Sequence, residues 1–503
     1  MSRRKKRCVV LCGAAGVGVA VLIAQLLPYV RPMNGTEQPS LTSKKLADLD
    51  TQSLTGPVSV AGSGDRFAVV QRVGNKRRVV VNGQPEKWYD EVAPPVFSPD
   101  GRRLAYAARK ARKWIAVVDG TEGEAYRRVA TPIFSHDGSH VAYGVRDFKG
   151  KTLVVVDGKP GKRYASVSAT VLLGPGLLFT PNNLICYSAK MGDSEHLVVG
   201  AREAKAGFLS IARLPVFSKD GRRMAYVTIP RGTAEYVVIA DGQQVGGRCD
   251  FVETGPLFSP NGKRLAYVGT FEDGGSAVVI DGVRQEPYSL VPGGNPVFSP
   301  DSRRLAYLAA EWPGKIMLVV DGKAQRLLTL PEGVWLRRDV PLFPVFSPDN
   351  RRIACAVPCG KEKYKDKYRV IVDGKVLSEF PGEIPPHSLA FSSDSARLVY
   401  VVQGKDAACV VVQKTKGKRY DSIRWQESLL SPDGRRVVYI AKEGKKEFVV
   451  VGKTEGPKYD AILVGRKGIV FDSPNTFHYI GRQGNSFFLV TEKLTDRRKR
   501  PPK

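Results

Sequence analysis

Pairs of adjacent cationic residues recur along the chain, each following the same short turn sequence. Guanidinium groups suit carboxylate and phosphate ligands, because their planar donors match the geometry of two oxygens. If the turns share one surface, the pairs predict an arc of cations that binds an anionic ligand. In a local alternative, each arginine pairs with an aspartate of its own turn (Asp100, Asp301, Asp433) and packs its stem along the surface. The candidate residues are Arg102, Arg103, Arg222, Arg223, Lys263, Arg264, Arg303, Arg304, Arg351, Arg352, Arg435 and Arg436.

Motifs typical of enzymes and metal sites are absent from the sequence. It contains no Gly-x-Ser-x-Gly, no phosphate-binding glycine loop and no His-Glu-x-x-His. The seven cysteines form no Cys-x-x-Cys pair and the five histidines do not cluster with them, which argues against zinc. Cys355 and Cys359 are close enough in sequence to form a disulfide in an exported protein, and His136 and His140 flank one turn. We predict no catalytic residue, no metal and no cofactor.

The turns belong to a repeat that occupies most of the chain. The sequence "PVFSPDGRRLAY", which begins at Pro95, recurs with small changes at Pro132, Pro215, Pro256 and Pro296. Eleven units follow one another at intervals of 37 to 48 residues, marked by Val60, Phe97, Phe134, Phe179, Phe217, Phe258, Phe298, Phe346, Phe391, Leu430 and Phe471. A period near 40 residues is the length of one four-stranded propeller blade.

Each unit contains four short runs of β-forming residues. An Asp-Gly or Asn-Gly pair, such as Asp119-Gly120, follows the third run and is a strong hairpin signal. Such aspartates could also suggest calcium, but hairpin chemistry accounts for them. Runs such as "TLVVVDG" scarcely alternate between apolar and polar residues, which is typical of a sheet covered on both faces. We therefore predict an all-β fold, a β-propeller of about eleven four-stranded blades.

The motif "F-S-P-D-G-x-R-L-A-Y" resembles the WD40-like (PD40) repeat of the TolB-type β-propellers. The resemblance covers nearly all of residues 57–491 and departs from the pattern at Phe179, at Cys355 and in the first unit. It implies a ring that mainly docks other macromolecules. The chain lacks the additional N-terminal α/β domain of TolB, so it is not TolB itself, and it lacks the peptidase half of the prolyl-oligopeptidase relatives.

Eleven units exceed the usual four to eight blades of a propeller. We expect two tandem rings within residues 56–491, divided near 290–340, where the longest interval indicates an insertion; one large ring is the alternative. The last unit supplies only three strands before the basic tail at 492–503. The segment from Lys44 to Leu54 could provide its fourth strand and so close a ring.

The N-terminal segment predicts a membrane anchor. After the basic "MSRRKKR", Cys8–Val30 is uncharged, and as a helix this segment is about 34 Å long, enough to cross a bilayer. The excess of basic residues before it keeps the N-terminus cytoplasmic and places the propeller on the extracytoplasmic side of the cytoplasmic membrane. Cleavage as a signal peptide near Gly18-Val19-Ala20 is the alternative, although the apolar run continues well beyond that site. Residues 1–30 would thus be the stub and anchor, and 31–55 a linker.

The net charge of +29 suggests anionic partners, although it says nothing about the fold. Nucleic acid is not expected as a partner, because the basic residues are spread over all units and no nucleic-acid motif is present. Our first hypothesis is a membrane-anchored docking scaffold for a protein or an anionic polymer, with no catalytic function. The second is a hydrolase or lyase that acts on polysaccharide or peptide in the channel, which requires at least three converging ionisable side chains, including His136 or His387.

Overall fold

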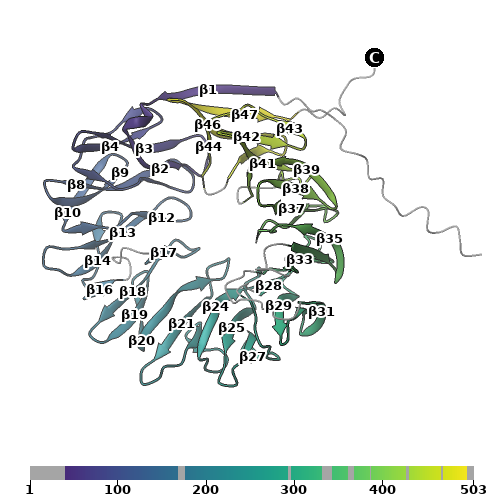
Figure 1. Cartoon of the computed structure of the whole chain (residues 1–503). Helices are drawn as coiled ribbons and strands as arrows, with labels where there is room; N and C mark the ends of the chain where they lie inside the picture. The colour runs from purple at the N-terminus through teal and green to yellow at the C-terminus, as the bar shows by residue number, and fades with distance from the viewer. Residues whose placement is uncertain are drawn as a thin grey trace, which may run out of the picture. The chain divides into compact units, whose positions relative to one another are not determined.

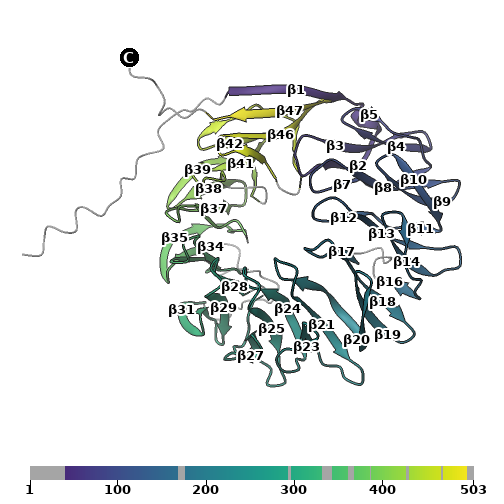
Figure 2. The same ribbon diagram turned by 180° about the vertical axis from the view of Figure 1, so that it is seen from behind.

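The computed structural model describes residues 40–167, 176–292, 296–330, 342–360, 367–385, 387–425, 430–465 and 468–494, all within one compact unit, Glu37–Lys503. In this described part the strands form an eleven-bladed β-propeller, seen along its axis in Figure 1 and from behind in Figure 2. The only helix among these residues is the 3-10 turn η1 (Thr51–Ser53). The all-β class and the propeller of eleven blades with about four strands each are confirmed.

Blades 1 to 10 are antiparallel sheets whose strands run in sequence order from the inside of the ring to the outside, whereas the outermost strand of blade 11 comes from the start of the described chain (Figure 1). Blade 1 contains β2 (Leu54–Val60), β3 (Phe67–Val73), β4 (Lys76–Val81) and β5 (Gln84–Pro85). Blade 2 contains β6 (Glu91–Val92), β7 (Val96–Phe97), β8 (Leu104–Lys110), β9 (Lys113–Val118) and β10 (Thr121–Tyr126). Blade 3 contains β11 (Arg128–Val129), β12 (Ile133–Phe134), β13 (Val141–Arg146), β14 (Thr152–Val156) and β15 (Lys159–Pro160).

Blades 4 and 5 share the long strand β20 (Arg202–Phe217), which pairs with β19 on one side and with β21 on the other. Blade 4 contains β16 (Ser166–Val167), β17 (Leu177–Phe179), β18 (Ile185–Met191) and β19 (Ser194–Val199). Blade 5 adds β21 (Met224–Pro230), β22 (Val237–Ala240) and β23 (Gln243–Gln244). Blade 6 contains β24 (Phe251–Phe258), β25 (Leu265–Thr270), β26 (Ser276–Ile280) and β27 (Val283–Arg284). Blade 7 contains β28 (Val297–Phe298), β29 (Leu305–Glu311), β30 (Lys315–Val320) and β31 (Lys323–Thr329).

The remaining blades complete the circle. Blade 8 contains β32 (Val345–Phe346), β33 (Ile353–Pro358), β34 (Lys367–Val372) and β35 (Lys375–Pro381). Blade 9 contains β36 (Ala390–Phe391), β37 (Leu398–Gln403), β38 (Ala408–Val412) and β39 (Thr415–Tyr420). Blade 10 contains β40 (Ser422–Arg424), β41 (Val438–Glu443), β42 (Lys446–Val451) and β43 (Thr454–Glu455). Blade 11 contains β44 (Ala461–Leu463), β45 (Val470–Ser473), β46 (Thr476–Gln483), β47 (Ser486–Lys493) and, from the start of the described chain, β1 (Ser40–Asp48).

The expected Asp-Gly hairpins connect the third and fourth strands of most blades. At Asp119-Gly120 both residues have positive φ, 50° and 76°, the combination that a type I′ turn requires. The Asp119 carboxylate also accepts a hydrogen bond from the backbone N–H of Leu104 at 2.9 Å, which ties the turn to β8. The dipeptide therefore fixes the position of the second strand as well as the reversal.

The core consists of separate apolar clusters, one at each junction between neighbouring blades. In β8, Tyr106 and Ala108 pack toward blade 1, while Ala107 packs toward blade 3. Because successive side chains of a strand point to opposite faces, both sets are buried, and the strand shows no polar alternation. This arrangement explains the continuous apolar runs of the sequence.

The expectation of two tandem rings is wrong. Two core clusters run without interruption through the expected division near 290–340: one joins blades 6 and 7, and the next joins blades 7 and 8. A further cluster, which includes Phe67 and Phe487, joins blade 11 back to blade 1. Eleven junctions closed in a circle leave no place for a second ring.

The ring is closed by β1, which pairs antiparallel with β47 from Ser40↔Lys493 to Asp48↔Ser486 (Figure 1). Residues 40–55 are thus part of the propeller, and the predicted linker at 31–55 is wrong for them. The prediction that Lys44–Leu54 supplies the outer strand of the last blade is confirmed in part: the strand is Ser40–Asp48, so only Lys44–Asp48 of the predicted segment belongs to it. Phe67 stacks on Phe487 with ring centroids 4.6 Å apart, and His478 Nε2 lies 2.6 Å from the Ser63 carbonyl oxygen of blade 1.

The predicted anchor at Cys8–Val30 and most of the predicted basic tail lie outside the described residues. Within the described ranges no helix has the length and apolar character needed to span a bilayer. The propeller continues past residue 491, because β47 extends to Lys493 and Leu494 is buried.

Candidate binding surfaces

The cation pairs lie at one end of the blades, which we call the turn face: the face formed by the turns between first and second strands (residues 98–103 in blade 2) and by the Asp-Gly turns. Both kinds of turn meet there because strands alternate in direction. Arg103 in the first kind donates from Nε to Asp119 in the second, at 2.9 Å. The predicted common surface therefore exists, but the two members of each pair have different environments.

The second residue of each pair joins neighbouring blades. Arg103 donates from Nη1 to the Ser139 carbonyl oxygen of blade 3 at 2.7 Å, and its guanidinium lies 5.4 Å from the ring centroid of Phe134. Arg223, Arg264, Arg304 and Arg352 repeat the bond to the Asp-Gly aspartate, the bond to the next turn and the contact with the next phenylalanine. These guanidinium groups make their contacts within the fold, and the binding role predicted for them stays a prediction.

Two further arginines occupy this inter-blade position and were missed in the sequence. Arg66 donates to the Gly101 carbonyl oxygen at 2.6 Å, and Arg397 donates to the Gly434 carbonyl oxygen at 2.6 Å. Each stands at the same repeat phase as Arg103 but follows a non-cationic residue, so a search for pairs overlooks it. In blade 3 His140 takes the position and contacts Asp157 at 2.7 Å through Nδ1.

Replacing one inter-blade arginine should destabilise the ring. Arg304→Met removes hydrogen bonds to Asp321 and to the Asn350 carbonyl oxygen of blade 8. We expect a loss of about 1–2 kcal/mol in the free energy of unfolding, measured by urea denaturation. Arg303→Met is the matched control and should change it by less than about 0.5 kcal/mol. Equal losses in the two variants would contradict the assignment.

The first residue of each pair is exposed: Arg102, Arg222, Lys263, Arg303, Arg351 and Arg435. The side chains of Arg102 and Arg222 are 86% and 85% exposed and lie 3.7 and 3.9 Å from the nearest turn carboxylate oxygen, Asp100 or Asp220. Such exposed ion pairs contribute little to the free energy of unfolding. Hydrogen bonds from the Ser98 hydroxyl and the Arg102 backbone N–H hold the pKa of Asp100 below its ordinary value. The carboxylate therefore stabilises the turn through these two bonds more than it binds the Arg102 side chain. The local alternative thus applies only loosely to these cations.

Four of the exposed cations, Arg222, Lys263, Arg303 and Arg351, belong to four successive blades, 5 to 8. Lys263 differs from the others because its turn carries Asn261 in place of aspartate. These four form the continuous part of the predicted arc, and Arg102 and Arg435 stand apart from it on blades 2 and 10.

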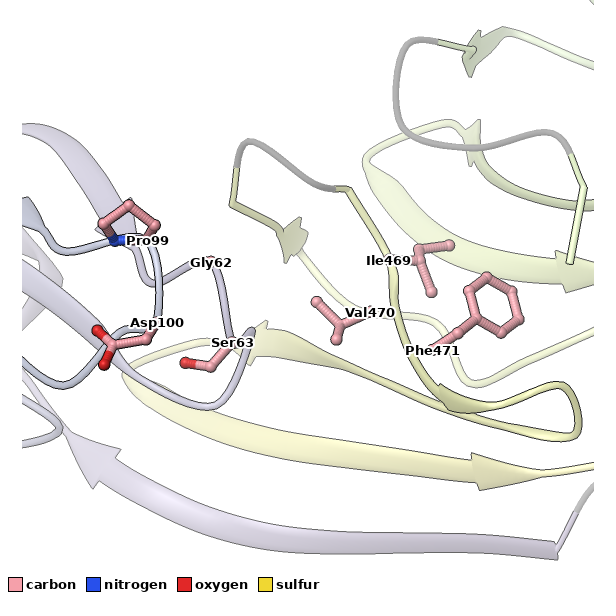
Figure 3. Close-up of a pocket in the computed structure, with 7 residues that line it drawn as sticks. All are labelled: Gly62, Ser63, Pro99, Asp100, Ile469, Val470 and Phe471. Carbon is pink, nitrogen blue, oxygen red and sulfur yellow. The ribbon is translucent and has the colours of Figure 1, made fainter. Parts of the chain in front are cut away.

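A pocket of about 400 Å³ on the turn face lies at the ring closure, between blades 1, 2 and 11. In Figure 3, Asp100 and Ser63 line one side and Ile469, Val470 and Phe471 the other. Among the described residues that line it, Asp100 is the only ionisable one, and its carboxylate accepts hydrogen bonds from the Ser98 hydroxyl and the Arg102 backbone N–H.

A smaller pocket of about 190 Å³ lies between blades 8 and 9 and gathers Tyr368, Glu383 and His387. The rings of Phe343 and His387 lie 4.3 Å apart. Desolvation, with a contribution from Glu383, raises the pKa of Tyr368 to about 12, so its hydroxyl stays protonated. His136, the other candidate histidine, contacts the Phe179 carbonyl oxygen of the next blade at 3.1 Å.

Among the described residues no cluster of three or more His, Cys, Asp or Glu side chains could hold a metal ion. Cys355 and Cys359 are both free thiols and form no disulfide. Burial raises the pKa of Cys355 to about 12, which keeps the thiol protonated and unreactive.

No family model matches the chain, and no curated protein matches it. Solved structures that resemble it include a eukaryotic initiation factor (14% identity, TM-score 0.37, covering 73% of this chain and 96% of that one). They also include TolB from Acinetobacter baumannii (14%, 0.24, 73% and 79%) and the β-propeller domain of the Trilobed protease from Pyrococcus furiosus (14%, 0.26, 55% and 97%). The fold of this chain is given by its own strand pairing, which forms an eleven-bladed β-propeller.

Proposed function

We propose that the protein is a docking scaffold, held in the cytoplasmic membrane by Cys8–Val30 with its propeller on the extracytoplasmic side. It binds a protein or an anionic polymer through the exposed cations of the turn face and catalyses no reaction.

The binding role rests on the different environments of the two residues in each cation pair. The second member is used inside the fold, whereas the first extends into solvent; Arg102 and Arg222 lie 3.7 and 3.9 Å from their turn carboxylates. Arginine and lysine side chains on adjacent blades suit a polyanionic ligand, because their individually weak contacts with it add. The positive electrostatic field of these residues also raises the rate at which such a ligand associates.

The binding role is tested with the full chain in mild detergent and fluorescent polyphosphate. Reversal of three cations, Arg222→Glu, Arg303→Glu and Arg351→Glu, should weaken binding by about tenfold or more, and high salt should abolish it. The matched control reverses Lys405 and Lys445, which are exposed in other hairpins. Equal binding by the wild type and the triple variant would contradict the role of the turn face.

The membrane location is tested by fractionation of cells that express the full chain. The protein should stay in the membrane fraction after an alkaline carbonate wash, and protease added to spheroplasts should cut the propeller. Release by carbonate, or protection of the propeller until the cells are lysed, would refute the anchored arrangement.

The alternative function, a hydrolase or lyase acting on polysaccharide or peptide, is favoured by one observation: the pocket that combines Tyr368, Glu383 and His387. Its test is the release of soluble products from bacterial cell-wall polymer or casein by the wild type and by Glu383→Gln and His387→Ala. Activity that both variants lose would support the enzyme, and turnover that both retain would exclude this pocket.

A further inference from the structure

The face opposite the turn face carries the hairpins between second and third strands, and we call it the hairpin face. Both ends of the described propeller lie at the turn face: Ser40 pairs with Lys493, and the Leu494 N–H donates to the Asn475 carbonyl oxygen of a first turn, at 2.7 Å. Within the described residues, the hairpin face therefore carries neither end of the propeller.

Positive charge is concentrated on the hairpins of blades 1 to 3. Residues 71–78, 108–115 and 145–152 contain eleven Lys and Arg side chains and one carboxylate, Asp147. On the same face the hairpins of blades 5 to 7, residues 228–236, 270–276 and 310–316, contain two cations and four carboxylates. Of the hairpins compared, those of blades 1 to 3 are thus strongly basic, whereas those of blades 5 to 7 are not.

The carboxylates near the basic hairpins are already occupied. Asp90 accepts from Lys76 at 2.7 Å and from the Ala111 N–H at 2.9 Å, so it links the hairpins of blades 1 and 2. Burial alone would raise the pKa of Asp147, but the Lys151 N–H and the Arg163 guanidinium bring it below its ordinary value. Asp147 is 9% exposed and orders its own turn, so it does not neutralise the surface.

Several cations remain without a carboxylate partner among the described residues. Arg112, Lys149 and Lys151 are exposed and take part in no ion pair there, and the same holds for Arg127 and Arg128 in the connection to blade 3. They are exposed to solvent in the free protein, and an acidic partner would neutralise them at the surface, where the cost of removing water is small.

Two aromatic side chains project among these cations. Trp88 is 40% exposed and lies under the Arg78 guanidinium at 4.3 Å, and Phe148 is 58% exposed with Lys113 Nζ 5.9 Å from its ring centroid. Lys113 belongs to blade 2 and Phe148 to blade 3, so the hairpins touch across the blade junction. Aromatic residues flanked by arginine are the side chains that dominate protein–protein contacts, whereas a simple polyanion needs cations only.

We propose that this cationic aromatic patch (Arg72–Arg78, Trp88, Arg109–Lys113, Arg127, Arg128 and Arg146–Lys151) docks an acidic segment of a partner protein that also carries apolar side chains. The carboxylates of the segment pair with the free cations, and its apolar side chains cover Trp88 and Phe148. The hairpins of blades 5 to 7 carry no comparable excess of cations, so the segment is directed to blades 1 to 3.

The test uses the full chain and a fluorescent peptide built from repeats of Glu-Phe-Glu-Ala. Reversing Arg112, Lys149 and Lys151 together to glutamate should weaken binding by about tenfold or more. Phe148→Ala should weaken it by about tenfold without any change in charge, and Trp88→Ala should do the same. The matched control is the turn-face variant Arg222→Glu, Arg303→Glu and Arg351→Glu, which should bind the peptide like the wild type.

Three comparisons decide the outcome. A peptide of Glu-Ala-Glu-Ala repeats, polyphosphate and phosphatidylglycerol vesicles are offered as competitors, and each should bind more weakly than the aromatic peptide. Tighter binding of polyphosphate or vesicles that is lost when Arg112, Lys149 and Lys151 are reversed, but is unaffected by Phe148→Ala, would overturn the protein partner in favour of a polymer or a lipid surface. Loss of peptide binding only in the turn-face variant would overturn this patch and leave the proposed scaffold intact, whereas absence of binding by every anionic probe would refute both.

Discussion

Replacing Phe487 by alanine is expected to lower the free energy of unfolding by about 3–5 kcal/mol, the range for a fully buried phenylalanine. Phe487 has no exposed surface and stacks on Phe67 at the junction where blade 11 meets blade 1. The substitution leaves a cavity at the one junction whose two sheets come from opposite ends of the chain. Urea denaturation monitored by tryptophan fluorescence measures the loss.

The matched control for Phe487→Ala is Phe148→Ala, which removes the same group from an exposed position. It should change the free energy of unfolding by less than about 0.5 kcal/mol. Because the weakened junction should open first, limited proteolysis of Phe487→Ala should begin in β1 or β47. First cleavage within blades 5 to 7 would contradict the view that closure depends on this cluster.

Replacing Glu492 by glutamine is expected to stabilise the protein at neutral pH. Glu492 is 1% exposed and accepts a hydrogen bond from the Tyr479 hydroxyl at 2.7 Å. Burial raises the pKa of Glu492 above the ordinary 4.5, so the folded protein holds this proton more tightly than the unfolded chain. The stabilisation that Glu492 contributes is fully present at a pH below its pKa in the unfolded chain. It is lost as the pH rises through the higher pKa of Glu492 in the folded protein.

Glutamine carries no charge at any pH and can still accept the bond from Tyr479. The Glu492→Gln variant should therefore match the wild type near pH 4 and exceed it on the alkaline side by on the order of 1–2 kcal/mol. Thermal unfolding from pH 4 to pH 9 checks the trend. The control Glu122→Gln should instead be less stable than the wild type at neutral pH, because the hydrogen bond from Lys110 lowers the pKa of Glu122 and so stabilises its charged form in the folded protein. A wild type more stable than Glu492→Gln at pH 8 would refute the prediction.

The repeat and the turn chemistry of the blades could be predicted from the sequence because they are local. Asp119-Gly120 specifies its hairpin through the conformations that the two residues tolerate, and β8 is apolar on both faces because it packs against two sheets. The number of rings could not be predicted in this way. It depends on the small rotation between adjacent blades, summed over the circle, and no single residue encodes it.

The roles of Arg102 and Arg103 show the same limit within the candidate site. The two residues are identical and adjacent, yet only Arg103 reaches the turn of blade 3. Their difference arises from contacts with a blade that begins some 25 residues later in the chain. The cationic aromatic patch was also missed, because its three hairpins become neighbours only when the blades stack, although "NKRR", "RKARK" and "DFKGK" stand at equal repeat phase.

The pairing of β1 with β47 has a consequence for the order of assembly. The first strand of the ring emerges from the ribosome long before its partner, because Ser40 pairs with Lys493. Inner blades can dock as soon as their successors are synthesised, whereas the last blade must wait for the whole polypeptide. Contacts so distant in the chain form slowly, since the intervening loop must first be ordered. Until then β1 presents an unpaired edge, which a nascent chain has to protect from other strands.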